Sequence, residues 1–175
     1  MTISLYDMTA GACLQILACT ADLMDKAKAH ADAQGIPEAD LMAARLAPDM
    51  WDLAMQVKAT VLFSAGALEG VIAGEFVPAM PDDLHDLAAL KAHVEQAIAR
   101  ITALDRAAVE GVVGKDACFK GRMSQMDFTA EAMLATFVMP NFYFHATTVY
   151  DILRAQGVPL AKRDYMGAPR LKTPA

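Results

Sequence analysis

Cysteine is scarce in this sequence, and its few cysteines form no recognisable motif. Cys13, Cys19 and Cys118 are odd in number and contain no CxxC pair. This set predicts neither a disulfide framework nor a tetrahedral thiolate zinc site. We therefore expect reduced, mostly buried thiols, and Cys118, in a connector that contains glycine and lysine, is the one open to exposure.

Basic residues and long apolar runs are also lacking. Lysine and arginine total 15 against 21 aspartates and glutamates, so the net charge is −6 and the pI is about 5.1. Such a chain repels phosphate backbones and anionic membranes. No uninterrupted apolar run approaches the roughly 20 residues of a membrane span, and the start, MTISLYDMTAGACLQ, lacks the basic segment of a secretory signal. We expect a soluble, cytoplasmic protein without nucleic-acid or membrane partners.

Common catalytic signatures are missing as well. The sequence contains no HExxH, no Glu-x-x-His, no GxSxG and no glycine-rich phosphate loop, which argues against the commonest helix-borne metalloenzymes and hydrolases. His85 and His93 are eight residues apart, about 12 Å along a helix, so they cannot chelate one ion. His30 lies near an expected helix end, where we expect it to be solvated.

What the sequence has in abundance is apolar residues in helical periodicity. Hydrophobic residues make up 55% of its 175 residues, which predicts one domain, 1–175, with a deep core or an association surface. Caps, stops and apolar steps of three and four residues predict four long helices. They run from Ser4 to about Ala33, from about Met50 to Ile72 with Asp49 as cap, from Asp82 to Leu104, and from Thr129 to Gln156 with a kink at Pro140. These elements predict an all-α four-helix bundle.

The connections between these helices differ in kind. Residues 74–83 contain two prolines, so this segment is expected to be extended. Roughly ten residues at about 3.3 Å each span about 30 Å, enough for a crossover along the bundle. Residues 105–128 form a connector that can hold a small hairpin turning near Lys120-Gly121. The tail, 158–175, is expected to pack back on the bundle.

The candidate site lies in PNFYFHATTVYDILRAQG, residues 140–157. Asn141 and His145 are one helical turn apart and share a face, and Gln56 lies on the second helix. If the two faces oppose each other, the three side chains meet inside the bundle. They then either hydrogen-bond one another and set the packing register, or form the polar base of a cavity with His145 as acid, base or single metal ligand. Because carboxamides are poor metal ligands, the trio predicts weak metal affinity. Trp51, Tyr143 and Tyr150 are candidate walls of the cavity.

Three segments resemble a known family. MTISLYDMT, RLAPDMWDLAMQV and MPNFYFHATTVYDILRAQGVPLAKRDYMG are similar to a bacterial and fungal family of uncharacterised function in the DinB-like and YfiT-like superfamily. The resemblance implies a four-helix bundle with a long crossover, a homodimer, and a divalent metal held by three histidines, one on the second helix and an HxxxH pair on the last. His145 matches the second histidine of that pair, Asn141 stands where the first would be, and Gln56 falls near the second-helix ligand.

Three hypotheses follow. The first is a DinB-like protein without a metal or other cofactor that binds a small, partly apolar ligand between its helices, through Gln56, Asn141, His145, Trp51, Tyr143 and Tyr150. The second, implied by the resemblance, is a divalent-metal-dependent thiol S-transferase or isomerase with His145 as the metal ligand. The third is a non-catalytic structural or partner-binding dimer with a filled core.

Overall fold

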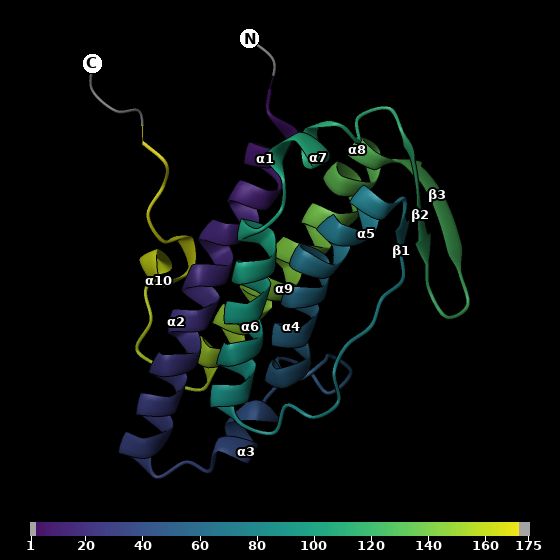
Figure 1. The fold of residues 1–175 in the computed structure, drawn as a ribbon. Helices are drawn as coiled ribbons and strands as arrows, with labels where there is room; N and C mark the ends of the chain where they lie inside the picture. Colours follow the sequence, from purple (N-terminus) through teal and green to yellow (C-terminus); the bar gives the residue numbers. More distant parts are fainter. Residues whose placement is uncertain (1–2, 172–175) are drawn as a thin grey trace.

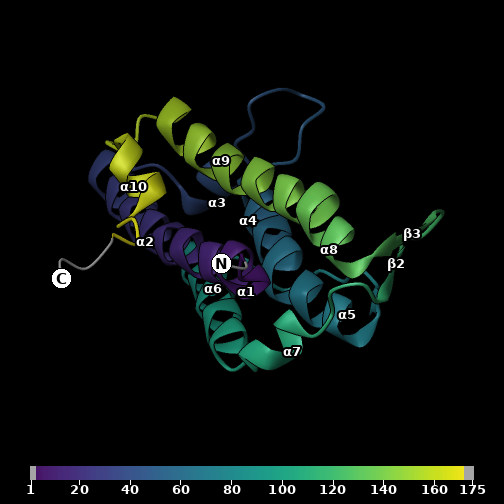
Figure 2. The same cartoon turned by 90° about the horizontal axis from the view of Figure 1, so that it is seen from above.

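Helices dominate the computed structural model, which describes residues 3–171 (Figure 1). Four long helical segments run alongside one another, and α2 packs most extensively on α6, and α4 on α9 (Figures 1 and 2). The segments are α2 (Ala10–Gln34); α4 (Leu53–Val61), the π-helical η1 (Leu62–Gly66) and α5 (Ala67–Ala73) in one run; α6 (Leu87–Thr102); and α8 (Ala130–Met133), the π-helical η2 (Leu134–Val138) and α9 (Met139–Ala155) in another. The prediction of a mostly helical fold is confirmed.

The first predicted helix is broken into two. Ser4 caps α1 (Leu5–Met8) as expected, since its hydroxyl accepts a hydrogen bond from the Asp7 amide at 3.1 Å. Thr9 then leaves the helical region with φ −116° and ψ −80°, and its hydroxyl donates to the Leu5 carbonyl at 2.7 Å. The chain resumes as α2, which ends at Gly35 with φ 67°, the left-handed conformation that glycine adopts without strain.

The second and third helices begin at later aspartates than predicted. The cap of α4 is Asp52, which accepts from the Met55 amide at 2.9 Å, rather than Asp49. The cap of α6 is Asp86, which accepts from the Ala89 amide at 2.6 Å, rather than a residue near Asp82. Asp86 has the extended backbone of a cap, and Glu38 of α3 (Glu38–Met42) adds a bond from the Leu87 amide at 3.1 Å. A carboxylate from a distant element thus helps to decide where α6 starts.

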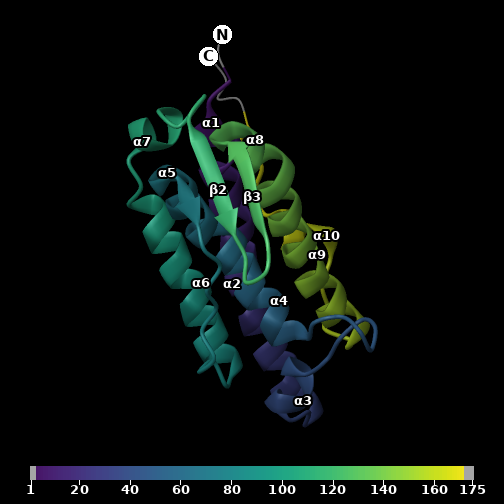
Figure 3. The ribbon, with the colours of Figure 1, turned by 90° about the vertical axis from the view of Figure 1, so that its right-hand side faces the viewer.

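A small sheet makes the all-α description too simple. Its strands are β1 (Glu75–Phe76), β2 (Asp116–Lys120) and β3 (Gln125–Thr129), in the order β1-β2-β3. β2 and β3 form the antiparallel hairpin that the sequence allowed, and β1 pairs with β2 in parallel, with Phe76 opposite Phe119. The preceding connector also contains α7 (Arg106–Glu110). Figure 3 shows the hairpin standing beside α8 and α5.

The two ends of the crossover lie at opposite ends of the helical body. Residues 77–86 leave β1 and run along the body to the start of α6 (Figure 1), as the proline-rich segment predicted. α4, η1 and α5 therefore point in the same direction as α6, which a short turn could not achieve.

One helix among residues 3–171, Leu53–Ala73, is long and apolar enough to cross a membrane by length and composition alone. In the fold, 72% of its apolar window is buried by other parts of the chain. A core helix packed on all sides passes the same test, so the observation is weak evidence for a membrane span.

The last described segment returns along α2. Its short helix α10 (Lys162–Met166) carries Asp164, which forms an ion pair with Lys26 of α2. Gln15 of α2 donates to the Met166 carbonyl at 2.7 Å. Residues 172–175 of the tail lie outside the described residues.

Candidate functional site

His145 lies on α9 with its ring held between two aromatic rings. Trp51 stacks on it with a centroid distance of 5.6 Å and an interplanar angle of 17°, and Phe63 of η1 stacks with 5.6 Å and 15°. Phe144 meets it edge-on at 5.3 Å. The side chain is only 6% exposed. These contacts fix the plane of the imidazole.

Hydrogen bonds then assign the proton on that ring. Nδ1 of His145 lies 2.7 Å from Oε1 of Gln56 on α4, and Nε2 of Gln56 donates to the Trp51 carbonyl at 3.3 Å. Because the second bond orients the amide with its oxygen toward the imidazole, Nδ1 must carry the hydrogen and donate it. Nε2 of His145 is left as the acceptor.

Nε2 of His145 is accessible to solvent. Within the part of the chain that the structure describes, every fully buried side-chain nitrogen or oxygen has a hydrogen-bond partner. Nε2 of His145 has none among these residues, so it is not fully buried. A ligand or a water can therefore reach it, although most of the side chain cannot be reached.

Burial also sets the charge of His145. Removal of the imidazole from water lowers its pKa to about 4, because a low-dielectric environment disfavours the charged form. The ring is consequently neutral at pH 7, and Nε2 is available to accept a hydrogen bond.

The space beside Nε2 is a shallow cavity of about 220 Å³, lined by Asp49, Met50, Trp51, Gln56, Phe144 and His145. A neighbouring groove of about 460 Å³ shares Met50 and Phe144 and continues along α9 past Tyr143 to Asp151. The outer wall is the 43–52 connection, which projects beside α9 (Figures 2 and 3). Arg45 holds this connection by donating to the Met50 carbonyl and to the Asp52 carboxylate, each at 3.4 Å.

The structure brings some of the predicted site residues together and separates others. His145, Gln56 and Trp51 are in mutual contact, and Tyr143 lines the neighbouring groove. Asn141 instead donates to the Phe137 carbonyl of its own helix at 2.8 Å. Tyr150 packs against Tyr165 of α10, with ring centroids 6.1 Å apart. Of the expected trio, Gln56 and His145 therefore form a hydrogen bond with each other, whereas the amide nitrogen of Asn141 bonds within its own helix.

Sequence reasoning missed Phe63, the ring beneath the imidazole, and Asp49, Met50 and Phe144, which line the cavity. Phe63 follows Gln56 by seven residues, two helical turns, so the periodicity of the helix contained a signal for it. Met50 and Asp49 had no such signal, because they belong to an irregular connection.

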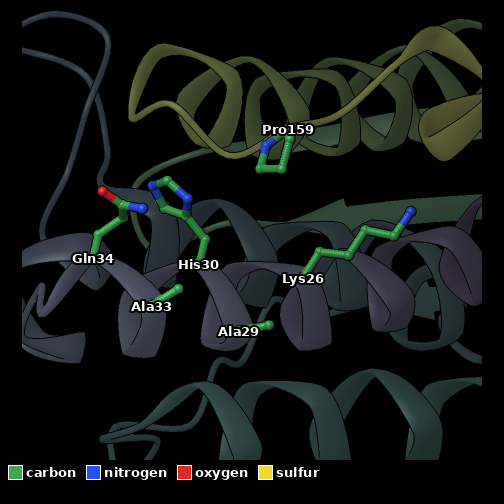
Figure 4. A pocket seen from close by; sticks show the side chains of 6 residues that line it. All are labelled: Lys26, Ala29, His30, Ala33, Gln34 and Pro159. Atoms are coloured by element: carbon green, nitrogen blue, oxygen red, sulfur yellow. The ribbon is translucent and has the colours of Figure 1, made fainter.

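A larger cavity of about 480 Å³ lies between α2 and Pro159, away from His145 (Figure 4). Its lining is mostly apolar, and its lysine, Lys26, already pairs with Asp164. Figure 4 shows Lys26 and Gln34 extending toward opposite ends, with His30 between them. Because its polar groups do not converge, this cavity offers less than the smaller one for binding a specific ligand.

The metal centre that the resemblance implied does not fit these residues. Of the three matching positions, Asn141 uses its amide within α9, and Gln56 uses its oxygen to hold Nδ1 of His145. One imidazole nitrogen remains, and a stable site needs several N, S or carboxylate ligands. Among residues 3–171, no group of three or more His, Cys, Asp or Glu side chains is placed to hold an ion.

Comparison with known proteins gives a family and a fold. A family model described as "Domain of unknown function (DUF1993)" matches residues 5–166. A crystal structure of a DinB family member protein from Shewanella denitrificans is similar, with a TM-score of 0.82 and 25% sequence identity over 97% of this chain and 96% of that chain. No curated protein matches the chain significantly.

Proposed function

The chain belongs to the DUF1993 family, an uncharacterised DinB-like family, and we propose that it binds a small, partly apolar molecule in the cavity beside His145. The observation that supports this most is the unpartnered Nε2 of a side chain that is 6% exposed. Because Nε2 can be reached from the cavity while most of the residue is buried, a ligand that donates a hydrogen bond there replaces water at one directed contact.

The proposal gives each residue a distinct role. Trp51 and Phe144 are the apolar walls, because both line the cavity and remain 46% and 56% exposed. His145 accepts a hydrogen bond from the ligand, and Gln56 keeps the imidazole in the tautomer that can accept it. Asn141 and Tyr150 act at a distance, by fixing α9 against η2 and α10.

Binding in this proposal needs neither a metal nor another cofactor. Elemental analysis of the purified protein tests this, and we expect no stoichiometric nickel, zinc, manganese or iron. A stoichiometric metal that disappears in His145→Ala would instead support the transferase or isomerase hypothesis, in which His145 is a metal ligand.

The test of ligand binding uses Trp51, because it is the sole tryptophan of the chain and stacks on His145. We expect its fluorescence to change in a saturable manner with at least one member of a panel of small metabolites. No change across the panel would favour the third hypothesis, a structural or partner-binding dimer.

Phe144→Ala tests whether the ligand binds in this cavity. It removes one wall of the cavity and should weaken binding by about fivefold, the equivalent of about 1 kcal/mol for one aromatic contact. Val113→Ala is the control, because Val113 is similarly exposed at 58% and lines neither cavity. Equal affinities for the two variants would place the ligand elsewhere.

A further inference from the structure

Resting on the proposed function, we infer that the ligand of the His145 cavity is a small organic cation, a primary or secondary ammonium group attached to an apolar body. Three features of the cavity select this class: the sign of its charges, the direction of its hydrogen bond, and the aromatic rings at its mouth.

The charged side chains along the cavity and groove are carboxylates. Asp49 lines the cavity and Asp151 lines the groove, and the described residues lining the two include no lysine or arginine. Arg45 lies on the same connection, but its guanidinium donates to the Asp52 carboxylate and the Met50 carbonyl. A carboxylate or phosphate ligand would therefore meet repulsion without a compensating partner, whereas an ammonium group meets attraction.

The imidazole adds a requirement for a donor. Gln56 occupies Nδ1 of His145, so the open Nε2 can only accept. A neutral ring in this position does not repel a cation, and the low pKa of His145, caused by burial, keeps it neutral. A primary or secondary ammonium N–H satisfies this acceptor, but a quaternary ammonium or a carboxylate has no hydrogen to donate.

The rings of Trp51 and Phe144 also favour a cation with an apolar body. Trp51 and Phe144 both line the cavity and keep about half of their surface exposed, at 46% and 56%. The face of an aromatic ring is electron-rich and attracts a cation within about 6 Å, most strongly for tryptophan. The same rings cover an apolar body, so one site serves both parts of the ligand.

The test is a set of probes that share a phenyl ring. Benzylammonium and benzyl alcohol differ only in the charge and hydrogen bonding of the head group, benzoate carries a carboxylate directly on the ring, and benzyltrimethylammonium keeps the positive charge but has no N–H. Each is titrated while Trp51 fluorescence is recorded at low ionic strength. For fragments of this size we expect a Kd on the order of 1 mM for benzylammonium. We expect about tenfold weaker binding of benzyl alcohol, weaker still of benzoate, and severalfold weaker binding of benzyltrimethylammonium.

Two substitutions then distinguish the effect of the Asp49 charge from a general effect of removing a surface carboxylate. Asp49→Asn should weaken benzylammonium about 2- to 5-fold, the usual range for an exposed ion pair, and leave benzyl alcohol unchanged. Asp22→Asn removes the same charge from an exposed position on α2 that lines neither cavity, and it should change neither affinity.

The outcomes distinguish this inference from the proposed function. Binding of benzyl alcohol or benzoate as tight as that of benzylammonium, or an Asp49→Asn variant with unaltered benzylammonium affinity, overturns the cation and leaves the binding site standing. The cation is also overturned, and the binding site retained, if a metabolite without an ammonium group binds and benzylammonium does not. If neither these probes nor any metabolite affects Trp51, both proposals fail.

Discussion

At the scale of single residues, the site depends on one histidine whose environment removes most of its usual chemistry. Stacking between Trp51 and Phe63 and the bond to Gln56 leave His145 with one orientation and one open nitrogen. An imidazole with a pKa of about 4 is a weak base at neutral pH. Its chemistry is therefore better suited to recognising a donor than to abstracting a proton.

The lowered pKa of His145 predicts a loss of stability in acid. The folded protein holds this pKa at about 4 against 6.5 for the free side chain, so the unfolded chain binds the additional proton between these values. Stability is therefore complete above about pH 6.5 and falls as the pH drops toward 4, by at most about 3 kcal/mol from this residue. Urea unfolding at pH 7 and pH 4.5 measures the loss.

The control for this experiment is His145→Phe, which keeps a ring between Trp51 and Phe63 but cannot titrate. His93 also has a lowered pKa, mainly from burial and also from Arg100 and Lys58, and it remains in both proteins. The wild type should lose about 2–3 kcal/mol more than the variant on acidification. Equal losses would mean that His145 titrates normally in the fold.

At the scale of elements, both helices that bear the site contain a π-helical turn. η1 carries Phe63, and η2 immediately precedes Met139 and Pro140 at the start of α9. Proline lacks an amide hydrogen, so a carbonyl one turn earlier loses its usual partner. The irregular hydrogen bonding of η2 and the side-chain bond of Asn141 to Phe137 accommodate this proline within a continuous helix.

This role of Asn141 is testable with a substitution of nearly equal shape. Asn141→Asp removes the donor and places a carboxylate against the Phe137 carbonyl, so we expect the free energy of unfolding at pH 7 to fall by about 1–2 kcal/mol. Gln96→Glu makes the same amide-to-acid change at an exposed position in the middle of α6 and should change it by less than about 0.5 kcal/mol. Similar values for both variants would show that the Asn141 bond contributes little.

Alanine is expected to have opposite effects at two glycines, because Gly70 touches β1 and Gly66 does not. A Cβ on Gly70 would lie 2.8 Å from Cα and Cβ of Phe76, which are fixed by the sheet, whereas a Cβ on Gly66 would meet only Cδ1 of Leu62 at 3.6 Å. Gly70→Ala should destabilise the protein by about 1–3 kcal/mol through overpacking. Gly66→Ala should stabilise it by up to about 1 kcal/mol, because alanine favours helix. Thermal or urea unfolding compares the two, and stabilisation by Gly70→Ala would contradict the close packing.

At the scale of the whole molecule, a chain of aromatic contacts joins the site to the sheet. Phe63 contacts the imidazole and also Phe76 of β1 and Phe137 of η2. Phe119 of β2 contacts both of these rings. The sheet therefore supports Phe63, which stacks on His145, and the 43–52 connection forms the outer wall of the cavity.

The homodimer implied by the resemblance stays a prediction, and it also belongs to this scale. We expect the purified protein to be a homodimer whose buried interface is mostly apolar. Light scattering should then give twice the mass of the chain. A monomeric mass across the concentrations used for the ligand titrations would contradict it. The fluorescence experiments on Trp51 are interpretable in either case.

The sequence by itself determined the helical segments, the crossover and the hairpin, because periodicity, caps, prolines and glycines act within a few residues of one another. It also placed Gln56 and His145 on faces that proved to oppose each other. Only the tertiary structure decided that Asp52 and Asp86 are the caps, that β1 pairs with β2, and that Asn141 bonds within its own helix. The cavity likewise exists only where Trp51, Phe63 and Phe144 surround the imidazole. The start of α6, the pairing of β1 with β2 and the cavity depend on contacts between segments distant in the chain, and local patterns carry no information about which distant segments meet. The Asn141 bond spans only four residues, but its amide could equally have bonded a neighbouring helix, and only the packing of that helix decides between the two.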